Sequence, residues 1–209
     1  MSGREKQQKR KEELRRRILD AACELFASDG YKNTSIRKIA EKIDYSIPTI
    51  YFYFKDKVDL FDAICEESFS ELEREHHEIF DLEPDPKIAL EKCMRSFVWF
   101  ALDHPNHFLV TFSAEFDHST DPDFVGRRQL IGMHSFDVLR QAVGKYLQSQ
   151  EKIVTEMEIE EASQIIAAST VGLTSWIIAL PNYTAFQKVN RESLIEKTIS
   201  TLLRGLIAS

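Results

Sequence analysis

Residues 34–57 gather side chains that can hydrogen-bond to bases and to phosphates. The hydroxyl, aromatic and cationic residues of this segment include Thr34, Arg37, Thr49, Tyr51, Tyr53 and Lys57. A guanidinium or hydroxyl group can read a base edge in the major groove, and an ammonium or phenol group can bind a phosphate oxygen. If the backbone places these groups on one surface, the chemistry that they support is nucleic-acid recognition.

Two short amphipathic helices are predicted to place them there. In the first helix, apolar residues recur at i, i+3, i+4 and i+7 and give one buried face: Ile36, Ile39, Ala40 and Ile43. Residues 44–46 then interrupt the pattern, and Ser46 is a suitable N-cap for a second helix. Pro48 fits the first turn of that helix, where a missing N–H costs little.

The second helix is predicted to divide its side chains between two roles. Packing toward the first helix is expected for Ile47, Ile50, Tyr51 and Phe54. The side chains that stay available to a partner are Thr49, Phe52, Tyr53 and Lys55. A helix-turn-helix that presents hydroxyls, rings and cations in this way is typical of a DNA-reading unit.

These motifs resemble the DNA-binding domain of the TetR family of bacterial transcriptional regulators. The resemblance is carried by Thr34-Ser35-Ile36-Arg37, by Ile39-Ala40 and by Thr49-Ile50-Tyr51-Phe52-Tyr53-Phe54-Lys55-Asp56-Lys57, and upstream by residues 18–22, 25–27 and 30–31. It covers residues 12–65. It implies an all-α protein, in which a three-helix DNA-binding domain (residues 1–57) precedes a helical ligand-binding and dimerisation domain (residues 58–209). Residues 1–10 are expected to form a flexible arm.

The resemblance also implies which residues meet DNA: Thr34, Arg37, Ile47, Pro48, Thr49, Tyr51, Tyr53 and Lys57. Arg37 is expected at a base edge, with a solvated charge or a phosphate contact as the alternative. Tyr51 is expected at a base or the adjoining backbone, and a purely structural place in the core stays open. Tyr53 and Lys57 are expected at phosphates. Thr34 is expected to cap the first helix of the pair and to bind a phosphate.

Two positions depart from the family's pattern. Asp44 stands where the turn usually has glycine, which is a mild change because Asp tolerates a left-handed backbone better than most residues. Ile47 stands where the second helix often begins with a polar residue. Readout at that position is therefore expected to be apolar or absent.

The charge of the chain is divided unevenly. Residues 1–57 hold 14 Lys and Arg against 9 Asp and Glu, a net charge of +5, and the remainder holds 13 against 25, a net charge of −12. A basic head on an acidic body is the asymmetry expected of a DNA-binding domain attached to a different domain. The overall net charge of −7 therefore does not argue against nucleic acid.

Periodicity predicts helices almost throughout the chain. Outside the DNA-reading pair, the predicted helices are residues 11–28, 56–79, 88–103, 106–116, 122–149, 158–180 and 190–207. Residues 162–187 carry no charge and are long enough to cross a bilayer. Their many polar side chains and Pro181 favour a buried packing helix instead. Its small residues would let a helix of a second copy approach closely, so residues 162–180 and 194–207 are predicted to form the dimer seam.

The body contains more aromatic residues than one helix face needs. Six lie within twenty positions: Phe97, Trp99, Phe100, Phe108, Phe112 and Phe116. Such a stripe is more often core than ligand site, but the family's second domain encloses a small-molecule pocket. The resemblance therefore implies a ligand cavity bordered by Trp99, Phe100, Phe112 and Trp176.

Other classes of function find little support in the sequence. No nucleophile elbow, phosphate loop or dinucleotide fingerprint is present, so no enzymatic activity and no cofactor are expected. The histidines lack the spacing and companions of a metal site, so no metal is expected. Cys23, Cys65 and Cys93 are far apart on apolar helical stripes, which indicates buried free thiols in a reducing cytoplasm. The charged N-terminus is not typical of a secretory signal.

The leading hypothesis is a ligand-responsive transcriptional regulator, most simply a repressor that binds a palindromic DNA operator as a homodimer. Its expected partners are double-stranded DNA, a small-molecule effector and a second copy of the chain, and no membrane. The alternative is a helical small-molecule-binding or scaffolding protein without affinity for DNA.

Overall fold

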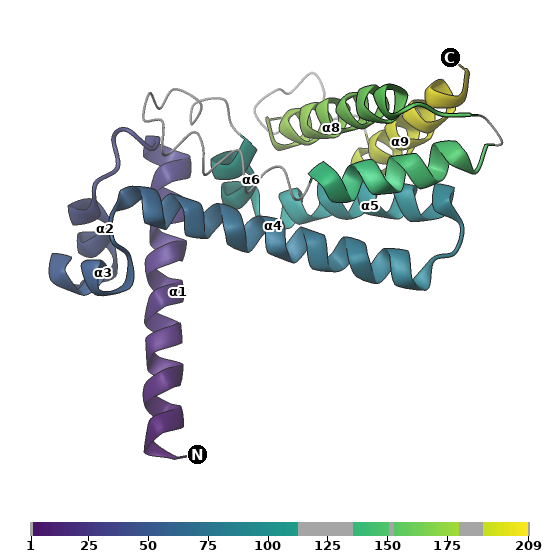
Figure 1. Ribbon diagram of the computed structural model, residues 1–209. Coiled ribbons are helices and arrows are strands. Elements are labelled where there is room, and N and C mark those ends of the chain that lie inside the picture. Colours follow the sequence, from purple (N-terminus) through teal and green to yellow (C-terminus); the bar gives the residue numbers. More distant parts are fainter. Residues whose placement is uncertain (1, 113–135, 151–152, 180–189, 209) are drawn as a thin grey trace. The chain divides into compact units, whose positions relative to one another are not determined.

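The computed structural model describes residues 2–112, 136–150, 153–179 and 190–208. Its helices are α1 (Gly3–Asp29), α2 (Ile36–Ile43), α3 (Ile47–Tyr53), α4 (Lys57–Leu82), α5 (Pro86–Asp103), α6 (Pro105–Phe112), α8 (Glu156–Ala179) and α9 (Arg191–Ala208) (Figure 1). Residues 136–148 form a further helix. No β-strand occurs in these described ranges, and the all-α prediction is confirmed.

The described residues fall into two compact units. The first unit contains residues 2–68 and 106–112, and the second contains residues 69–105, 136–150, 153–179 and 190–208. The domain boundary that the sequence predicts after residue 57 coincides with the start of α4, whereas the first unit continues to Ser68. That boundary, as a division of function, stays a prediction.

Helix α1 is longer than the sequence pattern predicts. Ser2 caps it through a capping box, in which the Ser2 hydroxyl accepts from the Glu5 N–H and the Glu5 carboxylate accepts from the Ser2 N–H. The first turns are rich in Lys, Arg, Glu and Gln, which are good helix formers. The flexible arm predicted for residues 1–10 is therefore wrong from Gly3 onward. The helix ends at Gly30, whose φ of 81° favours glycine.

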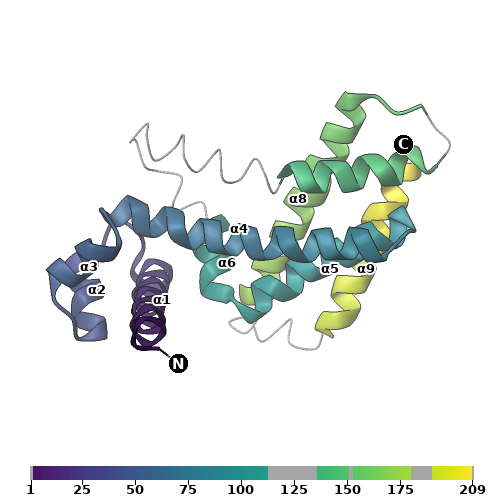
Figure 2. The ribbon, with the colours of Figure 1, turned by 60° about the horizontal axis from the view of Figure 1, so that its bottom comes forward.

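The core of the first unit is built around α1. Its side chains Ile18, Ala22 and Phe26 are fully buried. The rings of Phe26, Tyr31 and Phe61 form an aromatic cluster, with centroids 5.2–6.3 Å apart. Helix α1 contacts α2, and α2 contacts α3. Figure 2 looks nearly along α1 and shows α2 and α3 beside it.

The core of the second unit forms where α5 contacts both α8 and α9, which also contact each other. It is an apolar cluster of Leu90, Met94, Val98, Ala142, Val143, Tyr146, Leu147, Ile159, Ala162, Ile166, Ile177, Ile195, Ile199 and Leu203. The buried Tyr146 hydroxyl donates to the Leu203 carbonyl at 3.1 Å, which anchors the helix of residues 136–148 to α9. Among the described residues, one helix, α8, is long enough and apolar enough to cross a membrane, judged by length and composition alone.

The predicted helices of the body match the described ones closely, with ends that differ by one to three residues at most boundaries. The helix predicted for residues 106–116 begins at Pro105 and is described to Phe112. The helix predicted for residues 122–149 is described only from residue 136, so its predicted start lies outside the described residues, as does the loop predicted at 117–123. All three cysteines are buried free thiols, as predicted, and burial raises the pKa of Cys23 and of Cys93 to about 12.

Candidate nucleic-acid interface

The turn between α2 and α3 is fixed by caps at both helix ends. Asp44 ends α2 with φ 59° and ψ 49°, and its N–H donates to carbonyls in the last turn of α2. This is the left-handed conformation that the sequence predicts Asp44 to tolerate. Ser46 caps α3 by accepting from the Thr49 N–H at 3.3 Å, and Pro48 occupies the first turn. The two helices are therefore held at a defined angle by local chemistry.

Helix α3 packs through few side chains and exposes the rest. Ile50 and Phe54 are 0% and 3% exposed, and they anchor the helix to the unit. Ile47, Tyr51 and Phe52 are 40%, 52% and 70% exposed. The prediction that Ile47 and Tyr51 pack back is wrong, because a helix of seven residues turns only a narrow face to its neighbours. Tyr51 is therefore available to a partner and is not a core residue.

The other predicted contact residues of α3 lie near this exposed face. Pro48 is exposed, Thr49 and Tyr53 are half-buried, and the Thr49 hydroxyl lies 2.7 Å from that of Ser46. The Phe52 and Tyr53 rings meet edge to face, with centroids 5.2 Å apart. Large exposed apolar side chains on one short helix are unusual unless they meet a partner. No described contact assigns these residues to DNA, so their individual roles stay predictions.

Arg37 lies on the exposed side of α2, as the sequence predicts. Its Nε donates to the Glu41 carboxylate at 2.7 Å, and its side chain is 76% exposed. This bond, together with the negative charge, raises the pKa of Arg37. An exposed ion pair between residues four apart is weak and screened, so a guanine edge can replace the carboxylate.

Arg37→Ala is expected to lower affinity for the specific operator roughly tenfold or more and to change binding to random-sequence DNA little. The reason is that a bidentate arginine contact discriminates between bases. The measurement is a titration of both duplexes at one salt concentration. Equal losses on the two duplexes would make Arg37 a backbone contact.

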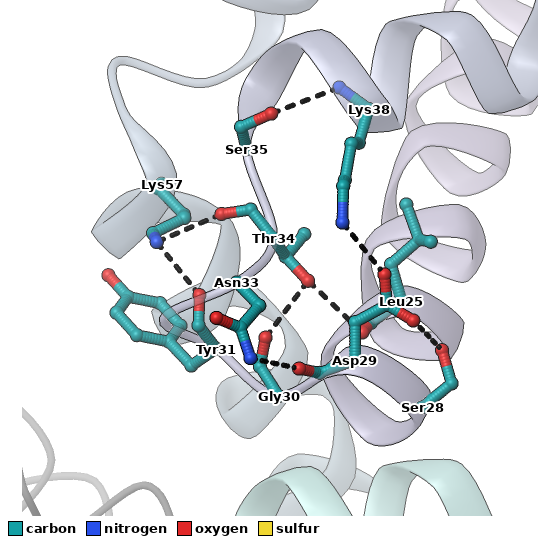
Figure 3. Close-up of polar contacts among 10 residues, drawn as sticks. All are labelled: Leu25, Ser28, Asp29, Gly30, Tyr31, Asn33, Thr34, Ser35, Lys38 and Lys57. Carbon is teal, nitrogen blue, oxygen red and sulfur yellow. Dashed lines mark hydrogen bonds and ion pairs between the residues drawn. The ribbon is translucent and has the colours of Figure 1, made fainter.

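Thr34 has a structural role that differs from the predicted one (Figure 3). It is 2% exposed, and its hydroxyl lies 3.1 Å and 3.0 Å from the carbonyl oxygens of Leu25 and Gly30, between which its proton is shared. The residue that caps α2 is Ser35, whose hydroxyl accepts from the Lys38 N–H. The helix-cap prediction for Thr34 is wrong by one residue, and its phosphate contact stays a prediction, which the burial of its hydroxyl does not favour.

Lys57 is also engaged inside the unit. Its ammonium donates to the carbonyls of Tyr31 at 2.8 Å and of Thr34 at 3.0 Å, and it lies 4.2 Å from the centroid of the Tyr31 ring (Figure 3). Burial lowers the pKa of Lys57. These contacts tie the start of α4 to the loop between α1 and α2. The predicted phosphate contact of Lys57 stays a prediction, and fixing this loop is the role that the geometry supports.

Lys57→Met is expected to destabilise the protein by about 1–2 kcal/mol, because two charge-assisted hydrogen bonds are lost from a half-buried site. Lys55→Met is the matched control, since the Lys55 side chain is exposed and has no partner among the described residues. It is expected to change stability by less than about 0.5 kcal/mol. Urea unfolding measures both. Equal stability of the two variants would show that the Lys57 contacts contribute nothing.

The predicted ligand-binding residues do not form one group in the described contacts. Phe112 belongs to the first unit, whereas Trp99, Phe100 and Trp176 belong to the second. Phe100 is buried and its ring lies 5.2 Å from that of His104, whereas Trp99 and Trp176 are 40% and 45% exposed. Neighbouring positions of a helix point in different directions, so Trp99 and Phe100 do not share a face. The ligand-binding set stays a prediction.

Two residues of this region have roles that the sequence did not predict. Phe52 was expected to be available but was not assigned to DNA, and it is the most exposed residue of α3 among the large apolar ones. Its position two residues from the buried Ile50 could have indicated this. Ser35 was overlooked as a helix cap because Thr34 precedes it, and both residue types cap helices. No group of three or more metal-ligating side chains occurs among the described residues.

The capped pair α2–α3 has the form of a helix-turn-helix DNA-binding unit, and comparison with known proteins identifies which kind. The sequence model of bacterial regulatory proteins of the tetR family matches residues 18–64, which run from α1 into α4. Over residues 18–64 the chain belongs to the TetR family of bacterial transcriptional regulators.

Curated relatives match part of the chain. The HTH-type transcriptional regulator AcrR of Shigella flexneri is 42% identical over 76 residues, which are 35% of each chain. The fatty acid metabolism regulator protein of Bacillus subtilis is 36% identical over 63 residues, which are 30% of this chain and 32% of its own. The chain thus spans about a third of the length of these curated relatives.

Solved structures match over the full fold. The transcriptional regulator FadR from Bacillus subtilis, in complex with stearoyl-CoA, has a TM-score of 0.74 and 24% identity, and the match covers 90% of this chain and 97% of that one. The fatty acid degradation regulator FadR from Bacillus halodurans has a TM-score of 0.75 and 19% identity, with coverage of 92% and 95%. At this level of identity the likeness shows the fold alone.

Proposed function

We propose that the protein is a transcriptional repressor that binds a palindromic operator as a homodimer and is released from it by a small molecule. The observation that carries the proposal is the exposed face of α3, where Ile47, Tyr51 and Phe52 are 40–70% exposed, together with the exposed Arg37 of α2. The family membership supports duplex DNA as the partner of this face.

A dimer is supported by the size of the reading helix. Helix α3 has seven residues, so one copy can contact only a few base pairs. Two copies related by a twofold axis double the number of base pairs read and require a near-palindromic operator. Their recognition helices then lie about 34–36 Å apart, or a multiple of that distance.

The surface of α8 supports a place for the dimer seam. One side of α8 is buried in its unit, through residues such as Ile166 and Ile177. A second apolar stripe runs along its exposed side at spacings of three and four residues: Ile165, Ala168, Gly172 and Trp176. A helix that is apolar on two sides is stabilised by a neighbour on each. We assign the exposed stripe, with α9, to the contact with a second copy.

For the effector we propose a molecule with a long acyl chain. The support is that the FadR of Bacillus subtilis was solved in complex with stearoyl-CoA, and that this chain matches 97% of that structure. The second unit also contains a buried polar group on α5, one of the helices that form its apolar core. Ser96 Oγ on α5 is buried without a hydrogen-bond partner among the described residues, and Phe100 is four positions further along.

A buried hydroxyl without a partner costs about 1–3 kcal/mol, which a polar group of a bound ligand would recover. Ser96 and Phe100 occupy i and i+4 on α5 and so lie on one face. We therefore centre the effector site on these two residues. Trp99 remains a proposed border residue, whereas Phe112 belongs to the other unit and Trp176 to the stripe assigned to the contact with a second copy.

A gel-shift titration tests the proposed function. The full-length protein is mixed with duplex DNA from the region upstream of its own gene, and with unrelated duplex of equal length, over a series of salt concentrations. A repressor binds the first duplex more tightly and loses affinity steeply with salt, because bound phosphates release counterions. Absence of binding to both duplexes at low salt would point to the alternative, a helical protein without affinity for DNA.

A further inference from the structure

The positive charge of the DNA-binding domain lies on only one part of it. Residues 1–17 hold 8 Lys and Arg against 3 Asp and Glu, whereas residues 18–57 hold 6 against 6. Residues 18–57, which comprise the rest of α1, the helix-turn-helix and the start of α4, are therefore neutral as a whole, and the net charge of +5 over residues 1–57 comes entirely from the first 17 residues. DNA binding by charge requires cations that neutralise phosphates.

Most cations of residues 18–57 are already engaged. Arg37 pairs with Glu41 at 2.7 Å, Lys38 with Asp29 at 3.0 Å and Lys42 with Glu24 at 3.0 Å. Lys57 donates to two backbone carbonyls. Only the side chains of Lys32 and Lys55 remain without a partner among the described residues of 18–57. A cation beside a carboxylate presents little net charge to a phosphate, so this surface alone attracts DNA weakly.

Two cations of α1 lie beside α3 and the residue that follows it. Lys11 Nζ lies 5.7 Å from the centroid of the Phe52 ring, and the Arg15 guanidinium lies 5.3 Å from that of Phe54. Contact with an aromatic face holds a cation in place without neutralising it. These two contacts therefore fix positive charge directly next to α3.

The N-terminal turns of α1 continue past the helix-turn-helix, as Figure 1 shows. Arg4 lies seven residues before Lys11 on the same helical face, or about 10 Å further along the axis at 1.5 Å per residue. Lys6 and Arg10, four residues apart, form a second cationic row. The side chains of Arg4, Lys6 and Arg10 are exposed and have no hydrogen-bond or ion-pair partner among the described residues.

We propose that the N-terminal turns of α1, residues 3–11, bind the phosphate backbone of duplex DNA beside the base pairs that α3 reads. The segment supplies most of the charge-dependent affinity and no base selectivity, because phosphates carry no sequence information. A rigid helix can hold these charges in a fixed row along the backbone. This inference rests on the proposed function, since it needs a protein that binds DNA through α3.

The test is the salt dependence of binding by the full-length double variant Lys6→Gln/Arg10→Gln. Gln keeps the helix propensity, so the fold is retained. If each residue binds one phosphate, the slope of log affinity against log salt becomes shallower by about 1.8 per bound protomer. Over a fourfold rise in salt, the wild-type affinity then falls about twelvefold more per protomer than that of the variant. The loss is expected to be equal for operator and random-sequence duplex.

The matched control is Arg74→Gln/Lys87→Gln, which removes two exposed cations from the second unit. This control is expected to keep the wild-type slope of log affinity against log salt. The charge-preserving variant Lys6→Arg/Arg10→Lys is expected to show the wild-type slope as well. A wild-type slope in Lys6→Gln/Arg10→Gln overturns the inference while the proposed function stands. A shallower slope in both double variants also overturns it, since the effect is then one of total charge. A wild-type protein that binds no duplex overturns both.

Discussion

Replacing Gly172 with Arg is expected to convert the protein to monomers and to abolish operator binding at concentrations that saturate the wild type. A Cβ added at Gly172 meets no atom within 4 Å, so the larger side chain is tolerated within the protomer. In the proposed dimer the same surface of α8 is covered by a second copy, where a guanidinium would be buried without a partner. Analytical ultracentrifugation and a gel shift measure the two effects.

The matched control for this variant is Gln141→Arg, which places the same side chain on an exposed position of the helix of residues 136–148. It is expected to stay dimeric and to bind the operator as the wild type does. Both variants are expected to melt as cooperatively as the wild-type protomer. If the Gly172→Arg protein sediments as a dimer with an unchanged dimerisation affinity, α8 is not part of the dimer seam.

Saturation with stearoyl-CoA is expected to weaken operator binding about a hundredfold. Such a drop needs about 2.7 kcal/mol of coupling, which lies within the usual allosteric range. The effector can produce it only by binding the DNA-incompetent arrangement more tightly than the competent one. Linkage then requires that saturating operator DNA lower the affinity of the protein for stearoyl-CoA by the same factor. Trp99 fluorescence can follow this titration, because Trp99 lies on α5 next to Phe100.

Free coenzyme A, which lacks the acyl chain, is the control for this experiment and is expected to leave operator affinity unchanged. Ser96→Ala is expected to lower the affinity of the protein for stearoyl-CoA and to leave DNA binding intact. If stearoyl-CoA binds equally well with and without saturating operator, the protein binds both partners without a switch. If it does not bind at all, the proposed class of effector is wrong, and the DNA-binding function is unaffected.

Local signals made the helix-turn-helix predictable from the sequence. Ser46 and Pro48 mark the start of α3, and Asp44 adopts the left-handed turn expected of it. The apolar spacing of α2 correctly gives Ile39 and Ala40 as buried. Caps, turns and helical periods depend on neighbouring residues only, so a sequence is sufficient to find them.

The roles of single side chains depend on distant partners and were harder to predict. Lys57 bonds to carbonyls of Tyr31 and Thr34, which lie 26 and 23 positions away. Thr34 is buried by the end of α1, and no local pattern distinguishes it from the cap Ser35. The helical state of residues 3–10 was missed because dense charge was interpreted as disorder, although the capping box of Ser2 and Glu5 was present.

Selection from a pool of random duplexes by the full-length protein tests the central claim most directly. A dimer that reads DNA through two copies of α3 is expected to enrich an inverted repeat, with half-site centres about 34–36 Å apart or a multiple of that distance. The variant Tyr51→Ala is expected to lose this enrichment, because Tyr51 lies on the exposed face of α3. Recovery of sequences with no common motif, or of a lone half-site, would contradict a sequence-specific dimeric repressor.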